Sequence, residues 1–246
     1  MKRTYLIKHA FISCCTAFLL LATTSIEAQT KPSSTKYTEK ELTNLSVEEL
    51  ALLRNEVLAR KGYVFSKGIY ASYFEMQNWY KPAKSNSSIV LNDTENAKVT
   101  LIKKVEDQKK AMRTKAINDL KEIKKAVNTN NSNELKRYFN NTEFSEDMLN
   151  ALKEIFRLCN LNDINFTRKE GLNKVSIDNG DAVYVYYIRF TTTQVILSEG
   201  RIEHSEIFGD FSDGYSSYMS EYEYTKWFVF NITEQGLKFD KWDIAG

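Results

Sequence analysis

Residues 46–62 read SVEELALLRNEVLARKG, and this stretch determines how the first half of the chain folds. Ser46 and Glu49 form the capping-box pattern, in which each side chain binds the backbone N–H of the other residue and so starts a helix. Gly62 can adopt the left-handed conformation that ends a helix. The pattern predicts a helix over residues 47–61. Its apolar positions follow at helical spacing: Leu50, Leu53, Val57 and Leu58.

Two further helices are expected after this one. A short helix is predicted over residues 69–74. Asn92, with a glutamate three residues later, is expected to cap a longer helix that continues to about Val127. The middle of that segment, residues 106–115, is almost wholly polar. Both a long charged helix and a break at this point are compatible with the pattern.

The period of the apolar residues changes from helical to strand-like in the second half of the chain. Short helices are predicted first, over residues 134–139 and from Ser145 to Phe156. Asp178-Asn179-Gly180-Asp181 is a strong hairpin signal. Further turns are expected at Ser198-Glu199-Gly200, at 209–214 and at 234–236, with strands over 183–193, 215–231 and 237–244. The sequence therefore predicts the α+β class: a small helical N-terminal domain, then a domain of helices and a curved antiparallel sheet.

The first 28 residues have the three parts of a secretory signal peptide: a basic start, an apolar run over residues 11–22, and a cleavage site after Ala28. The apolar run is shorter than the roughly 20 residues that a membrane-spanning helix needs. An uncleaved anchor is therefore the weaker alternative. Lipid attachment at Cys14 or Cys15 is disfavoured, because the most apolar part of the run follows these cysteines.

The patterns divide the chain into four segments. These are a signal peptide over residues 1–28, a flexible lead-in over 29–40, a helical domain over 41–110 and an α+β domain over 111–246. We expect the protein to work in the periplasm or outside the cell. No further long apolar run follows the leader, so no transmembrane segment is expected after its removal.

The charge balance of the exported part excludes one class of function. The whole chain has 34 Lys+Arg and 32 Asp+Glu, and the leader holds three of the basic residues and one of the acidic ones. The part that follows the leader therefore carries no net charge. A protein that binds nucleic acid normally has a basic surplus, so we expect no nucleic-acid partner.

Side chains that could perform chemistry are scarce. Cys159 is the only cysteine after the leader, so it cannot form an internal disulfide, and we expect it in the core. His204 is the only histidine there, and no G-x-S-x-G motif accompanies it. Zinc and calcium motifs are absent from the sequence, and Asp210–Gly214 is interpreted as an acidic turn. We therefore assign no catalytic residue, no metal site and no cofactor.

Residues 53–65, LRNEVLARKGYVF, resemble the YARHG domain, a small domain of exported bacterial proteins. Leu58-Ala59-Arg60-Lys61-Gly62 stands where that family usually has Tyr-Ala-Arg-His-Gly, so any role of the usual Tyr and His is absent here. The resemblance covers about residues 40–110 and implies an exported, envelope-associated protein without implying a reaction. The matching positions are Arg54, Asn55, Ala59, Arg60, Gly62, Phe65, Tyr73, Phe74, Trp79, Tyr80 and Pro82.

Two interpretations of the motif remain open. Arg54 falls on the apolar side of the predicted helix, where an unpaired charge is costly. Its candidate partners are Trp79, Tyr80 and Glu95. In the first interpretation, Arg54, Asn55 and Arg60 form a polar latch that ties the helix to the turn at Trp79. In the second, Trp79 and Tyr80 stack on a sugar or peptide while Arg60 supplies charge.

The closing segment of the chain, over residues 227–243, is weakly similar to the last strands of NTF2-like domains. The tyrosines of residues 184–224 are interpreted as sheet packing rather than a carbohydrate platform. The sequence thus predicts an exported envelope protein, a non-enzymatic binding module for a glycan, peptidoglycan or a protein. The alternative is an enzyme whose active site lies in a C-terminal NTF2-like pocket.

Overall fold

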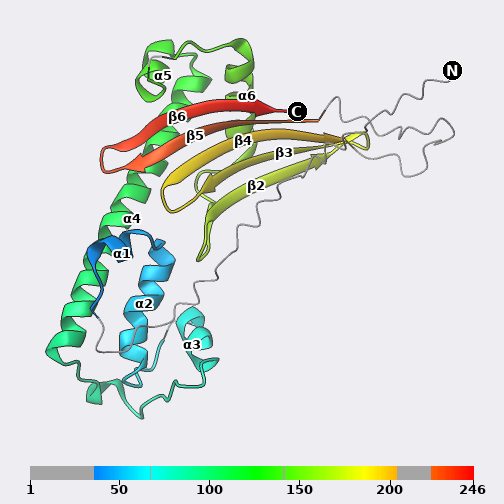
Figure 1. Cartoon of the computed structure of the whole chain (residues 1–246). Coiled ribbons are helices and arrows are strands. Elements are labelled where there is room, and N and C mark those ends of the chain that lie inside the picture. Colours follow the sequence, from blue (N-terminus) through cyan, green and yellow to red (C-terminus); the bar gives the residue numbers. More distant parts are fainter. Residues whose placement is uncertain (1–35, 67, 141, 204–222) are drawn as a thin grey trace, which may run out of the picture.

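The computed structural model describes residues 36–66, 68–140, 142–203 and 223–246. Helices form the N-terminal part, and a twisted antiparallel sheet with further helices forms the rest (Figure 1). The α+β class with a helical N-terminal part is thereby confirmed. The signal peptide, His204, the turn at 209–214 and the start of the strand over 215–231 lie outside the described residues.

The N-terminal helices begin where the sequence predicts them. Ser46 Oγ accepts a hydrogen bond from the Glu49 backbone N–H at 3.0 Å, and a Glu49 carboxylate oxygen accepts one from the Ser46 N–H at 2.9 Å. Gly62 has a φ of +85°, which is the left-handed conformation that ends the helix. The three helices are α1 (Glu39–Thr43), α2 (Val47–Ala59) and α3 (Gly68–Glu75), followed by the short 3₁₀ helix η1 (Asn86–Ser88).

A single unbroken helix, α4 (Asp93–Asn128), joins the two parts of the molecule (Figure 1). The continuous alternative is therefore confirmed, and the boundary expected at residue 110 falls inside this helix. Its 36 residues extend over about 54 Å. The first half of α4 contributes Ile102 and Val105 to a small core with α1 and α2. The second half contributes Leu120 and Ile123 to the main core against the sheet.

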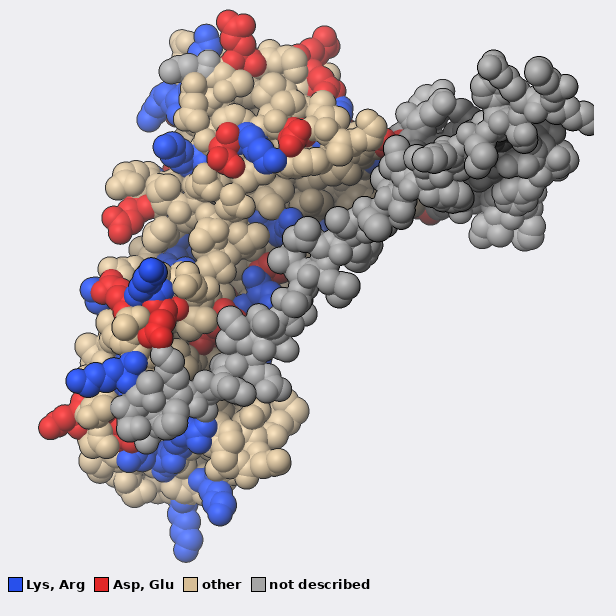
Figure 2. All heavy atoms as spheres, in the orientation of Figure 1, with Lys and Arg blue, Asp and Glu red and all other residues tan. Residues whose placement is uncertain are grey.

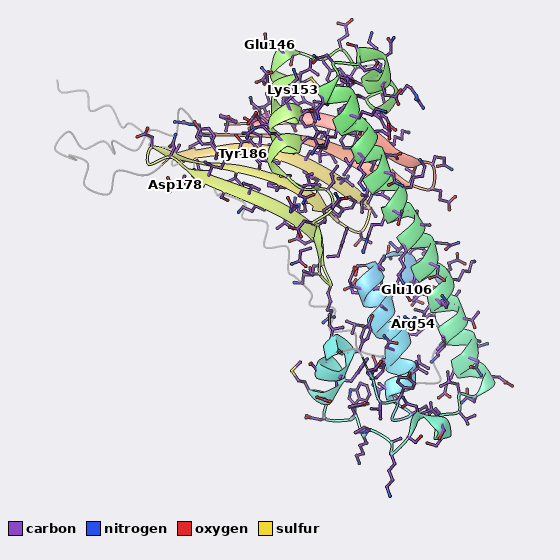
Figure 3. The ribbon with its side chains drawn as sticks, turned by 180° about the vertical axis from the view of Figure 1, so that it is seen from behind. Arg54, Glu106, Glu146, Lys153, Asp178 and Tyr186 are labelled. Carbon is purple, nitrogen blue, oxygen red and sulfur yellow. The ribbon has the colours of Figure 1, made fainter. Side chains whose placement is uncertain are left out.

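The polar middle of α4 is explained by its contacts with α2. Glu106 is almost fully buried, and Arg54 of α2 donates to its carboxylate at 2.8 Å, while Lys110 binds the other oxygen. Figure 3 shows Arg54 and Glu106 between the two helices. The three partners expected for Arg54 are therefore wrong. Glu95 instead pairs with Lys61 at 3.1 Å. The crossing of α2 and α4 places Glu106, and not Glu95, beside Arg54.

A second set of contacts joins the N-terminal helices to the sheet. Arg113 of α4 binds both carboxylate oxygens of Glu48 at 2.7 and 2.8 Å. Its guanidinium also lies 3.9 Å from the centre of the Phe166 ring. Ser46 Oγ donates to the carbonyl oxygen of Arg168 at 2.8 Å. Two-point arginine–carboxylate pairs fix orientation as well as distance, so these contacts hold α2 in place beside the first strands.

The sheet follows the chain order without a crossover, and every pair of neighbouring strands is antiparallel. Helices cover only one of its faces (Figures 1 and 3). The other face is mostly free of charged side chains in the view of Figure 2. The elements are α5 (Ser132–Tyr138), α6 (Glu146–Leu158), β1 (Asn165–Phe166), β2 (Gly171–Asp178), β3 (Ala182–Phe190), β4 (Gln194–Glu203), β5 (Tyr224–Thr233) and β6 (Gly236–Ala245).

One expected turn is wrong. Ser198-Glu199-Gly200 lies inside β4, where it is paired with β3 on one side and β5 on the other. The chain turns earlier, and the Thr191 hydroxyl accepts from the Gln194 N–H at 2.9 Å to close that turn. Gly200 marks a close approach instead, because a Cβ atom there would lie 3.3 Å from Thr225 Oγ1. The hairpin at Asn179-Gly180 is confirmed.

Within the described ranges, no helix is both long enough and apolar enough to cross a membrane. The long helix α4 is rich in charge along much of its length.

Replacing Glu106 with glutamine is expected to lower the free energy of unfolding by about 2 kcal/mol at neutral pH, because Arg54 loses its buried partner. Burial alone would raise the pKa of Glu106, but the hydrogen bonds and positive charges of Arg54 and Lys110 together lower it. The pairing therefore stabilises the fold above the ordinary pKa of 4.5, and this contribution is lost as the pH falls through the folded value. Urea unfolding measures both effects.

The wild type and the Glu106→Gln variant should thus become more alike in their free energy of unfolding below about pH 4.5. Asp107→Asn serves as the control, since Asp107 is exposed on the same helix and pairs with the exposed Lys103. If the Glu106→Gln variant were as stable as the wild type at pH 7, Glu106 would not stabilise the fold as the buried partner of Arg54.

Gly62→Ala is expected to destabilise the protein by about 1–3 kcal/mol. The position has a positive φ, and an added Cβ atom would lie 2.8 Å from the carbonyl oxygen of Lys81. Gly68→Ala is the matched control, because nothing lies within 4 Å of its added Cβ. Thermal unfolding compares the two. Equal melting temperatures for both variants would refute the steric account.

Candidate functional site

Aromatic rings gather around Phe74, which is fully buried at the end of α3. The ring centre of Phe74 lies 4.9 Å from that of Phe65, 6.0 Å from Trp79 and 6.1 Å from Tyr80. We call this group the aromatic cluster. Aromatic pairs at such distances stabilise a fold beyond the area that they bury. The cluster thus organises α3 and the turn that follows it. Its members are Tyr63, Phe65, Tyr70, Tyr73, Phe74, Trp79 and Tyr80.

Arg60 and Trp79 are brought together at the surface of this cluster. The guanidinium carbon of Arg60 lies 4.1 Å from the centre of the Trp79 ring. Glu56, one turn earlier in α2, binds the same guanidinium at 2.8 Å. Arg60 is exposed and Trp79 is half-buried. The pair is therefore accessible, but the arginine already occupies the ring of the tryptophan.

Tyr80 is held inside the cluster by its hydroxyl, which donates to the carbonyl oxygen of Tyr63 at 2.8 Å. Burial raises the pKa of Tyr80, and the nearby Glu75 adds to this effect, so the hydroxyl remains a donor. The strand-like segment around Pro82 is fastened to the end of α2, because the Ala83 N–H donates to the Gly62 carbonyl at 2.8 Å. These residues therefore serve the local fold.

The remaining motif residues of α2 face away from the Trp79 turn. Asn55 is buried and accepts a hydrogen bond from Arg54 at 3.3 Å, and Ala59 is buried beside them. Arg54 reaches α4 through Glu106. The structure thus brings Arg60, Trp79 and Tyr80 together, whereas Arg54 and Asn55 belong to the contact between the two long helices.

The sequence did not predict a groove of about 300 Å³ between α2, α3, α4 and the connection from β1 to β2. We call it the junction groove. It joins residues that are about 100 positions apart, so no local pattern could reveal it. The only local signal was the pair of tyrosines in the predicted helix over 69–74. The apolar and aromatic lining is formed by Val47, Ala51, Leu52, Ile69, Tyr70, Tyr73 and Phe166.

The charged residues of the junction groove are paired to different extents. Its two carboxylates, Glu48 and Glu106, are each paired with cations. Arg168 lies at the groove with its guanidinium 5.8 Å from the centre of the Tyr73 ring. Among the described residues Arg168 has no carboxylate partner. The lining therefore holds two cations, Lys110 and Arg168, and two carboxylates, and of these four charges Arg168 alone has no partner of opposite sign among the described residues.

Other candidate chemistry in the described residues is accounted for by packing. Cys159 is buried, as expected, and burial raises the pKa of its thiol to about 11, so little thiolate exists at neutral pH. In the ranges that the structure describes, no three histidine, cysteine or acidic side chains are grouped so as to hold a metal ion.

Residues 27–107, about a third of the chain, match the family model of the YARHG domain. This match extends from before α1 to the buried Glu106 of α4 and includes the whole aromatic cluster. No curated protein and no solved structure matches the chain, and nothing supports the NTF2-like resemblance. The N-terminal part of the chain is therefore similar to the YARHG domain, a domain associated with exported proteins.

Proposed function

We propose that the protein is an exported, non-enzymatic binding module of the cell envelope, and that its ligand occupies the junction groove. The YARHG domain and the predicted signal peptide over residues 1–28 support export to the periplasm or the cell exterior. Cleavage after Ala28 leaves the described residues intact.

The apolar lining of the junction groove is the observation that carries the proposal. Ile69 is 76% exposed beside Tyr70 and Tyr73, although a side chain of this size gains about 1.5–3 kcal/mol on burial. A concave surface with apolar walls and few polar groups is the usual form of a ligand site. A ligand that covers Ile69 would therefore recover this free energy.

The charges of the groove indicate the chemistry of the ligand. Arg168, which has no carboxylate partner among the described residues, lies with its guanidinium beside the aromatic wall. An acidic peptide segment fits both the guanidinium and the apolar wall. Its carboxylates can pair with Arg168, and its apolar side chains can enter the groove. We therefore favour a protein, or the peptide part of peptidoglycan, over a bare glycan at this position.

In this proposal the contact of Arg60 with the turn at Trp79 and Tyr80 supports the groove. Trp79 and Tyr73 both contact Phe74, so the turn after α3 sets the position of a groove residue. The guanidinium of Arg60 covers the Trp79 ring, which leaves less of that ring for a ligand. The Arg60 part of the latch interpretation is therefore favoured over the platform interpretation, whereas Arg54 and Asn55 contact α4 and not the turn.

Sedimentation of the purified protein with isolated cell-wall sacculi tests the proposal. The wild type is expected to be retained, and Ile69→Asp is expected to weaken retention at least tenfold, because it places a charge against apolar walls. Val90→Asp is the matched control, since Val90 is 75% exposed and lies outside the groove. Circular dichroism confirms that both variants fold.

Trp79→Ala distinguishes the two interpretations of the motif. The latch interpretation predicts a loss of about 2 kcal/mol in unfolding free energy, with retention preserved at a temperature where the variant is folded. Loss of retention in a folded Trp79→Ala would instead support the platform. The junction groove would be rejected as the ligand site if the Ile69→Asp and Val90→Asp variants were retained on the sacculi equally well.

A further inference from the structure

A cavity of about 360 Å³ lies between α6 and the end of α4. We call it the basic pocket. Figure 3 shows Lys153 on α6, beside the last turns of α4. The basic pocket shares no residue with the junction groove, and Lys124 lies about 21 Å along α4 from Lys110 of that groove. The polar lining is formed by Lys124, Asn128, Asn130, Lys153, Glu154 and Arg157.

The charges that line the basic pocket are unequal. Three of its side chains are cations, and one, Glu154, is a carboxylate. Arg157 binds that carboxylate at 2.6 Å, and the hydrogen bond lowers the pKa of Glu154, so the carboxylate is ionised at neutral pH. Lys124 and Lys153 are half-buried, and neither forms an ion pair with any described residue. Three positive charges and one negative charge therefore leave the lining with two unpaired lysines.

Donors that the local structure does not use gather at the same place. At the end of α4, the carbonyl oxygens of residues 125–127 accept hydrogen bonds from the N–H groups of residues 129–131 at 2.8–3.2 Å. The helix end is thus closed without a lysine, although basic side chains often bind the last carbonyls of a helix. The side-chain amides of Asn128 and Asn130 make no hydrogen bond within the described ranges. Two ammonium groups and two amides remain to bind a ligand.

These donors match a phosphate monoester. Such a group carries a charge of about −1.5 to −2 at pH 7 and three strong acceptor oxygens. A carboxylate carries a single charge and two oxygens, so it would balance only one of the two lysines. Lysine is a common ligand of phosphate, for which it acts as a point charge. The volume of the pocket exceeds that of one phosphate group, so part of the molecule that carries the phosphate also fits.

We propose that the basic pocket binds a phosphate monoester, carried either by a soluble sugar or by a lipid headgroup. The proposal depends on the charges of α4 and α6 and not on the ligand of the junction groove. It adds a second binding site, for an anion, at the other end of the helix that forms one wall of the groove.

Titration calorimetry of the purified protein with inorganic phosphate and with glucose 1-phosphate, at one fixed ionic strength, tests the proposal. Glucose 1-phosphate is expected to bind with a Kd of about 1 mM or below, and glucose is expected not to bind. Lys153→Gln and Lys124→Gln are each expected to weaken the binding about five- to tenfold, because each removes one charged donor. Lys136→Gln is the matched control, since Lys136 is an exposed lysine of α5 outside the pocket.

Vesicles distinguish the two sources of the phosphate. Sedimentation of the protein with phosphatidic acid vesicles, but not with phosphatidylcholine vesicles, identifies a lipid headgroup if Lys153→Gln abolishes it. Binding of the soluble phosphates without sedimentation identifies a soluble ligand.

Two results would overturn the proposal. One is the absence of binding for both soluble phosphates. The other is an equal loss of affinity in Lys136→Gln and Lys153→Gln, which would show that only the overall charge of the protein attracts the anion. Ile69→Asp, which tests the junction groove, is expected to leave the Kd for glucose 1-phosphate unchanged, so the two proposals can fail independently.

Discussion

The carboxylate of Glu106 is buried in the contact between α2 and α4. Burial of a charge is costly, and its pairing with Arg54 and Lys110 offsets this cost. The ion pair therefore selects one alignment of the two helices. Farther along α4, Arg113 adds a two-point contact with Glu48 and covers the Phe166 ring. The junction groove exists because α2 and the β1–β2 connection are both held against the same helix.

The parts of the fold that depend on local chemistry could be predicted from the sequence. The caps at Ser46, Asn92 and Ser145 each satisfy backbone donors within three residues, and all three helices begin there. The hairpin at Asn179-Gly180 has the same local origin. The turn expected at Gly200 was wrong because a glycine signals close approach inside a strand as readily as it signals a turn. The polar middle of α4 was ambiguous, since its partners lie 52 and 65 positions away.

Only those contacts of the candidate site that join residues close in sequence could be predicted. Arg60, Trp79 and Tyr80 were expected together and lie together. The partner of Arg54 was not found, because the crossing of α2 and α4 decides it. The junction groove needs residues near 70 to meet residues near 167. Such an arrangement leaves no pattern in a single stretch of sequence.

Hydrogen–deuterium exchange of the protein, with and without soluble fragments of isolated sacculi, tests the central claim that the junction groove holds the ligand. The account predicts added protection in α2 and α3 and, at the same time, in the connection from β1 to β2, because all three line one groove. Protection in only one of these segments, or around Trp79 alone, would contradict the account.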